Sequence, residues 1–212
     1  MDLITKIKNL KKTQIKLRVD KKLKEFSSFK NKNSNEWFSE LCFCILTANS
    51  KAKTAINIQN DLKAIGFCNF SENKIKKCII KNKHRFHNNK TNYIICAREF
   101  INIKQIINEI IKKDDEIVLR DFIVKNIKGL GYKEASHFLR NVGFFNFAIL
   151  DRHIINLMIE NKIIKEKPNN LSNKKTYVEL EKQILNIANK LKMSAAELDL
   201  YMWYLKTNEV LK

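Results

Sequence analysis

Apolar residues recur every three or four positions along most of the chain, which is the spacing of amphipathic α-helices. Residues 177–191 show this pattern clearly, with Leu180, Ile184, Ile187 and Leu191 on one face. The same periodicity predicts helices over residues 1–29, 34–46, 52–65, 72–81, 90–102, 103–113, 115–126, 134–142, 151–161, 177–191 and from 194 onward. The pattern therefore predicts an all-α protein.

Several helix ends can be predicted from residues that favour caps. Ser34 is a favoured N-cap, and Ser194 stands three residues before Glu197, the spacing of a capping box. Gly66 is expected to end the helix before it, because glycine favours the position after a helix. The polar stretch 161–173, which holds the only proline, is predicted to be a loop.

Two of the chain's four glycines stand at alternate positions in the segment 128–133, KGLGYK, between two predicted helices. We expect these glycines to let the turn adopt positive φ and to leave its backbone N–H groups exposed. Exposed amides at the positive end of a helix dipole form a binding site for phosphate. The segment therefore predicts a helix-hairpin-helix unit that binds a nucleic-acid backbone.

The charge of the chain agrees with this prediction. Lys and Arg number 41 against 22 Asp and Glu, which gives a formal net charge of +19 over 212 residues. A basic surface favours polyphosphate partners through counterion release. The heavy use of lysine, asparagine and isoleucine also suggests a compositional bias, which by itself could make a protein basic. The charge therefore supports a nucleic-acid partner without identifying it.

The cysteines indicate a reducing compartment. There are five, without a CxxC pair and without histidine at metal-ligand spacing, so we expect no metal site. Most lie in apolar runs, where free cysteine behaves as a small core residue. The N-terminus lacks the apolar core of a signal peptide, and no apolar run approaches the length of a membrane span. We expect a cytoplasmic, nucleoid-associated protein.

Three segments together resemble the helix-hairpin-helix DNA glycosylase superfamily. They are residues 128–143, the Asp-x-His pattern in 150–153, and the C-terminal stretch 201–212. Within the superfamily they resemble the archaeal-type branch of 8-oxoguanine DNA glycosylase/lyases, over most of the chain. Relatives of the endonuclease III type usually carry four cysteines for an iron–sulfur cluster after the aspartate. Here no cysteine follows Cys96, which argues against that cluster.

The resemblance implies roles for two residues. Lys133 would attack C1′ of the damaged nucleotide and form a Schiff base that permits β-elimination, and Asp151 would be the aspartate that stabilises charge at C1′. The alternative for Lys133 is chance, because about one residue in five is basic. The alternative for Asp151 is an N-cap, since aspartate favours that position. Capping and catalysis can both hold for Asp151.

Further residues are assigned to DNA contacts by the same resemblance. The base must leave the duplex, and Asn49 is the candidate to fill the gap. Phe86 is expected to contact the flipped base, and Arg85 is expected near the opposite strand. Backbone contacts are expected at the hairpin, from Lys128, Gly129 and Gly131. The alternative for Asn49 is an ordinary residue in the turn after a helix.

The C-terminal part supplies the remaining candidates. Trp203 is a second stacking residue for the flat lesion, although an aromatic on a helix is usually a core residue. In this branch the chain ends in a lysine that reaches the lesion pocket, which points to Lys212; the alternative is a lysine in solvent. His153 is expected to pack against or orient its neighbours rather than transfer protons.

The resemblance also implies the architecture and the reaction. Residues 31–144 would form a helical barrel ending in the hairpin, and residues 1–30 with 145–212 would form a second helical subdomain, with a DNA-binding cleft between them. The expected reaction is excision of 8-oxoguanine from double-stranded DNA and cleavage at the abasic site, by a monomer. No cofactor is expected, although hairpin carbonyls could bind a monovalent cation. The alternatives are a glycosylase for another damaged base and a non-catalytic helix-hairpin-helix DNA-binding protein.

Overall fold

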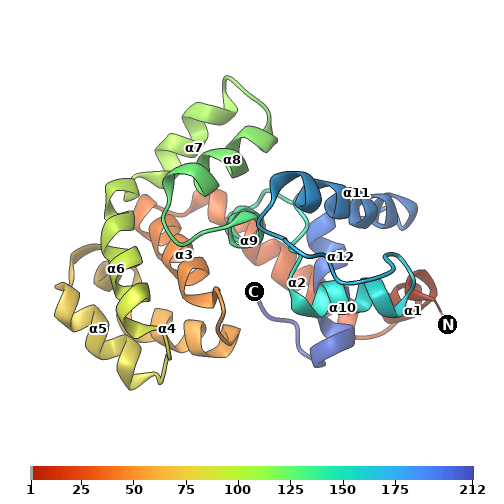
Figure 1. Cartoon of the computed structure of the whole chain (residues 1–212), viewed down its shortest axis with the longest axis horizontal. Helices are drawn as coiled ribbons and strands as arrows, with labels where there is room; N and C mark the ends of the chain where they lie inside the picture. The colour runs from red at the N-terminus through yellow and green to blue at the C-terminus, as the bar shows by residue number, and fades with distance from the viewer. Residues whose placement is uncertain (1) are drawn as a thin grey trace. The chain divides into compact units, whose positions relative to one another are not determined.

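The computed structural model describes residues 2–212, which form helices joined by turns and contain no strand (Figure 1). The prediction of an all-α protein is confirmed. The α-helices of the described residues are α1 Leu3–Leu10, α2 Ile15–Ser28, α3 Ser34–Thr47, α4 Ala52–Asn69, α5 Glu72–Lys81, α6 His87–Ala97, α7 Ile103–Ile111, α8 Glu116–Asn126, α9 Tyr132–Asn141, α10 Arg152–Glu160, α11 Lys174–Lys190 and α12 Ala195–Thr207. Two short 3₁₀ segments follow α2 and α6.

The chain divides into two compact units. One unit is Phe29–Phe138, and the other combines Leu139–Lys212 with the chain up to Ser28. The division falls inside α9, so the first part of this helix belongs to one unit and its last residues to the other. The predicted subdomain boundaries at residues 31 and 144, and the cleft between the subdomains, stay predictions.

Helix α3 is the centre of the unit Phe29–Phe138. Its residues from Trp37 to Thr47 are all buried, because apolar side chains surround the helix on every side. It contacts α4, α6 and α7, and the ring of Trp37 meets the edge of Phe138 at 6.3 Å between centroids. The N-cap is Asn33 rather than the predicted Ser34, and Asn33 forms a capping box with Glu36.

Several predicted helices have different ends in the structure, among them α6, predicted over 90–102, and α11, predicted over 177–191. The single helix expected over residues 1–29 is divided into α1 and α2, because no apolar residue between Leu10 and Ile15 could extend the buried face. The hydroxyl of Thr13 accepts a hydrogen bond from the amide of Ile15 where α2 begins. Helix α4 extends past Gly66 to Asn69, but it is interrupted at Lys63, whose backbone is not helical (φ 54°, ψ 178°). The guanidinium of Arg98 donates to the carbonyls of Phe67 and Phe70 and supplies the cap at that end.

A buried ion pair joins three helices of the other unit. The guanidinium of Arg140, near the end of α9, pairs with the carboxylate of Asp199 on α12, and both side chains are buried. Arg140 also lies 4.8 Å from the ring centroid of Phe26 on α2 and donates to the side chain of Asn141. Burial raises the pKa of Asp199 to about 6, although Arg140 opposes that change. Burying these two charges costs desolvation free energy, which their mutual attraction and the other contacts of Arg140 offset.

Replacing Arg140 with methionine is expected to lower the free energy of unfolding by about 3–5 kcal/mol, because the Asp199 carboxylate would be left buried without its partner. Urea unfolding followed by circular dichroism measures this change. The double variant Arg140→Met/Asp199→Leu is the control, and it should recover most of the loss because no charge is left buried. A loss below about 1 kcal/mol in the single variant would contradict this account.

Candidate active site

The turn between α8 and α9 contains the glycine pair, and one of the two glycines has a left-handed backbone. Gly129 has φ +90°, and a Cβ at this position would lie 2.4 Å from the ring of Tyr93 on α6. No side chain fits at this position, for both backbone and packing reasons. Gly131 is not left-handed, and a Cβ there would first meet a carboxylate oxygen of Glu134 at 3.5 Å. Positive φ was predicted for this turn, and it is found at Gly129 but not at Gly131.

The amide of Gly131, just before α9, is not exposed in the way the sequence suggested. The N–H of Gly131 donates to Oε2 of Glu134 at 3.3 Å, because a glutamate at the third helical position can reach back to the N-cap. The other carboxylate oxygen of Glu134 forms an ion pair with Nζ of Lys133 at 3.0 Å. A phosphate that binds at this helix end must therefore displace Glu134 or share the site with it.

Lys133 stands in the first turn of α9, where the helix begins, and its side chain is 26% exposed. A second lysine is part of this cluster. Lys90 on α6 is only 5% exposed, and burial lowers its pKa to about 8. The carboxylate of Glu134 opposes this shift and the ammonium of Lys133 adds to it. Sequence reasoning missed Lys90, since nothing distinguishes one lysine of an amphipathic helix in so basic a chain.

Asp151 is the N-cap of α10, and its Oδ1 accepts a hydrogen bond from the amide of Ile154 at 2.9 Å. The preceding residues are held by α11. The hydroxyl of Tyr177 accepts from the amide of Leu150 and donates to the carbonyl of Ala148. The carboxylate of Asp151 is therefore fixed by its own helix and by the anchored segment before it. The capping role considered for this residue is observed.

Trp203 and His153 contact each other in the same unit. Their rings lie 5.0 Å apart between centroids at an interplanar angle of 84°, an edge-on arrangement between α12 and α10. The indole Nε1 of Trp203 is buried and has no hydrogen-bond partner among residues 2–212. A buried N–H without a partner is uncommon in folded proteins.

Two loops of the unit Phe29–Phe138 carry the other base-contact candidates. Asn49, just after α3, is exposed and left-handed with φ 58°. Phe86, just before α6, is half-buried under the guanidinium of Arg85, which lies 4.4 Å from its ring centroid. The imidazole of His84 contacts the carbonyl of Leu46 at 3.0 Å through Nε2. This buried contact ties the loop of Phe86 to the end of α3, next to Asn49.

Lys128 and Lys212 remain as predicted candidates for DNA contacts. Lys128 is exposed on the hairpin and Lys212 is half-buried at the end of the described chain. Lys133 and Asp151 belong to different compact units, so their expected meeting across a cleft stays a prediction. Within residues 2–212, no group of three or more His, Cys, Asp or Glu side chains could hold a metal ion. No helix of the described chain is long and apolar enough to cross a membrane.

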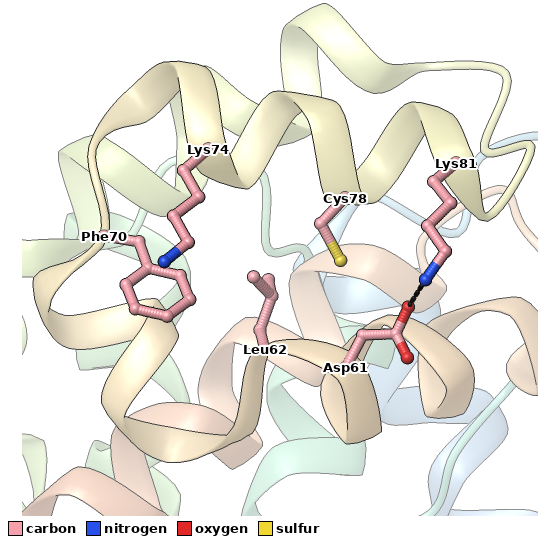
Figure 2. A pocket seen from close by; sticks show the side chains of 6 residues that line it. All are labelled: Asp61, Leu62, Phe70, Lys74, Cys78 and Lys81. Atoms are coloured by element: carbon pink, nitrogen blue, oxygen red, sulfur yellow. Dashed lines mark hydrogen bonds and ion pairs between the residues drawn. The ribbon is translucent and has the colours of Figure 1, made fainter.

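A pocket of about 270 Å³ lies between α4 and α5, and none of the predicted site residues lines it (Figure 2). Its polar groups already have partners. Lys81 pairs with Asp61 at 3.3 Å, and the ammonium of Lys74 lies 3.4 Å from the ring centroid of Phe70. Leu62 gives the pocket an apolar wall, and Cys78 contributes a thiol. The pocket has no group suited to the chemistry expected near Lys133.

Comparison with known proteins identifies the family. Residues 19–193 match the family model described as 8-oxoguanine DNA glycosylase with a helix-hairpin-helix. The chain belongs to this family. It is 48% identical to the 8-oxoguanine DNA glycosylase/AP lyase of Methanocaldococcus jannaschii over 212 residues, which is all of both chains. It is 38% identical to the enzyme of the same name from Korarchaeum cryptofilum, over all of this chain and 98% of the relative.

Solved structures of family members have the same fold. The M. jannaschii 8-oxoguanine glycosylase/lyase, in a complex with a 15mer DNA containing 8-oxoguanine, matches with a TM-score of 0.95 and 46% identity over 99% of each chain. The 8-oxoguanine DNA glycosylase of Thermotoga maritima matches with a TM-score of 0.90 and 32% identity, over 99% of this chain and 98% of that one. The family predicted from the sequence, and its class of DNA repair enzyme, are confirmed.

Replacing Gly129 with alanine is expected to lower the free energy of unfolding by at least about 2 kcal/mol, from the left-handed backbone and the collision with Tyr93. DNA binding should weaken as well, because the hairpin would change shape. Urea unfolding and fluorescence anisotropy at one fixed salt concentration measure the two effects. Gly131→Ala is the matched control, with a smaller expected effect on both. Equal losses in the two variants would mean that the Tyr93 contact is unimportant.

Proposed function

We propose that the protein excises 8-oxoguanine from double-stranded DNA and cleaves the strand at the resulting abasic site. The observation that carries this proposal is Lys133 in the first turn of α9, directly after the hairpin, in a chain of the 8-oxoguanine DNA glycosylase family. The relative from M. jannaschii carries both activities in its name and is seen with DNA that contains 8-oxoguanine. A non-catalytic DNA-binding protein would need neither a lysine nor a fixed aspartate in these places.

In the proposed reaction the amine of Lys133 forms a bond to C1′ while the bond between C1′ and the base breaks. The amine then forms an imine with the opened sugar, which makes the neighbouring C2′ proton acidic. Loss of that proton expels the 3′ phosphate by β-elimination. Asp151 stabilises positive charge at C1′, and its capping bond to Ile154 keeps the carboxylate in place for this role.

Recognition of the lesion is assigned to aromatic and terminal residues. Phe86 and Trp203 stack on the flipped base. His153 orients Trp203 through their edge-on contact. Lys212 completes the lesion pocket.

The rest of the duplex is bound by the loops and the hairpin. Asn49, exposed beyond α3, fills the gap left by the base, and Arg85 contacts the opposite strand. The amides at Gly129 and Gly131, together with Lys128, bind phosphate once Glu134 is displaced. A monovalent cation on the hairpin carbonyls would act by holding that phosphate. The enzyme works as a monomer on the DNA of the nucleoid.

Lys133→Gln is expected to abolish both base excision and strand cleavage while DNA binding persists, because binding rests on backbone amides and on dispersed positive charge. Borohydride reduction of wild type on an 8-oxoguanine duplex should give a covalent adduct, and the variant should give none. Lys128→Gln is the matched control on the hairpin and should still be trapped. If Lys133→Gln is trapped and Lys128→Gln is not, the nucleophile is Lys128.

Asp151→Asn is expected to slow single-turnover excision at least about a hundredfold, the usual effect of a positioned charge or general base. Folding should be retained because asparagine also caps helices, which thermal melting can verify. Asp115→Asn provides the control, since Asp115 caps α8 with a bond of 2.9 Å to the amide of Ile117. Near-normal excision by Asp151→Asn would leave Asp151 as a helix cap alone.

A further inference from the structure

Arg120 is a buried arginine on α8, the helix before the hairpin turn, and it contacts α9 at two places. Arg120 is only 3% exposed. Its Nη1 donates to the hydroxyl of Ser136 at 3.2 Å, and Ser136 is fully buried on α9. The guanidinium carbon lies 5.7 Å from the ring centroid of Tyr132, the first residue of α9, which is within the range of a cation–π contact. All three residues belong to the unit Phe29–Phe138.

These two contacts determine how α9 is turned about its own axis. Residues 132 and 136 are four positions apart, so they lie one above the other on the same face of the helix. The hydroxyl of Tyr132 also donates to the carboxylate of Asp121 on α8, at 3.5 Å. A helix that is held at two points on one face resists rotation, because rotation would break these contacts. Lys133 follows Tyr132 directly, so the direction in which its side chain leaves α9 depends on Arg120.

The proposed chemistry is sensitive to this direction. Cα atoms lie about 2.3 Å from a helix axis, so a rotation of α9 by about 20° would move the Cα of Lys133 by about 0.8 Å, and its amine further. A displacement of about 1 Å at a reacting group can cost about a hundredfold in rate. The ion pair of Lys133 with Glu134 cannot oppose such a rotation, because Glu134 is on the same helix and turns with it.

We propose that Arg120 is a positioning residue, whose two contacts with α9 keep the amine of Lys133 directed at C1′ of the damaged nucleotide. The inference rests on the function proposed above for Lys133. Arg120 itself contacts no DNA and transfers no proton in this account. The close packing at Gly129 fixes the hairpin turn, and Arg120 fixes the rotation of the helix that follows the turn.

Three variants separate the contacts of Arg120 from its charge and from general stability. Arg120→Met removes the guanidinium, Arg120→Lys keeps the charge without the planar fork, and Ser136→Ala removes only the acceptor on α9. Arg98→Met is the matched control, because Arg98 lies in the same unit and its guanidinium donates to the carbonyls of Phe67 and Phe70 at the end of α4. Each protein is reacted with a preformed abasic duplex in single turnover, at a temperature where its melting curve shows that it is folded. Borohydride trapping measures the rate of imine formation.

The expected result is a loss of rate without a matching loss of DNA binding. Arg120→Met should be trapped about tenfold to a hundredfold more slowly than wild type, and Arg120→Lys and Ser136→Ala at least about threefold more slowly. The Kd for an undamaged duplex at one fixed salt concentration should stay within about threefold, because Arg120 is buried and the surface lysines are unchanged. Arg98→Met should be trapped at the wild-type rate. The double variant Arg120→Met/Ser136→Ala should be no slower than Arg120→Met, because the two residues act through one contact.

Several outcomes would overturn the inference. They are a wild-type trapping rate in folded Arg120→Met, an equal loss of rate in folded Arg98→Met, and additive losses in the double variant. If Arg120→Met does not fold, Arg120→Lys and Ser136→Ala decide, and wild-type rates in both would refute the positioning role.

Failure of the proposed function has a different signature. Absence of trapping in wild type, or trapping that persists in Lys133→Gln, would refute the function itself. Trapping that depends on Lys133 but is unchanged in the variants of Arg120 and Ser136 would refute only the inference about Arg120.

Discussion

At the start of α9 the carboxylate of Glu134 contacts a backbone amide and one lysine, and it acts electrostatically on a second lysine. It accepts a hydrogen bond from the amide of Gly131, pairs with Lys133 and attracts the buried amine of Lys90. The same carboxylate therefore caps the N-terminus of α9 and forms an ion pair with the proposed nucleophile. It also occupies one of the amides that a DNA phosphate would use.

The position of this cluster depends on close packing beneath it. The ring of Tyr93 lies so near to Gly129 that no other residue fits, and the same helix carries Lys90. In the other compact unit, the buried ion pair of Arg140 and Asp199 joins the end of α9 to α12, and Arg140 also contacts α2 through the ring of Phe26. The start of α9 is therefore held by the glycine turn and the contacts of Glu134, and its end by a buried ion pair.

The helical pattern of the sequence was a good guide to the fold and a poorer guide to details set by distant residues. The prediction of α5 over 72–81 agrees with the structure, because its caps and apolar face are local. The end of α4 was predicted wrongly, because the helix breaks at Lys63 and then resumes as far as Asn69. Arg98 caps that end from 28 and 31 residues away. The division between α1 and α2 was missed because regular spacing alone does not show where the buried face stops.

The sequence by itself determined the helical class, the hairpin and, through resemblance, the family and the roles proposed for Lys133 and Asp151. These depend on local spacing and on residue types that stand together in the chain. Only the tertiary structure decided that Lys90 is buried near Glu134. Burial and electrostatic neighbours come from packing between helices, and Lys90 is 43 residues from Lys133 in a chain with 41 basic residues. Among so many lysines, only the desolvation imposed by the fold distinguishes one amine from the rest.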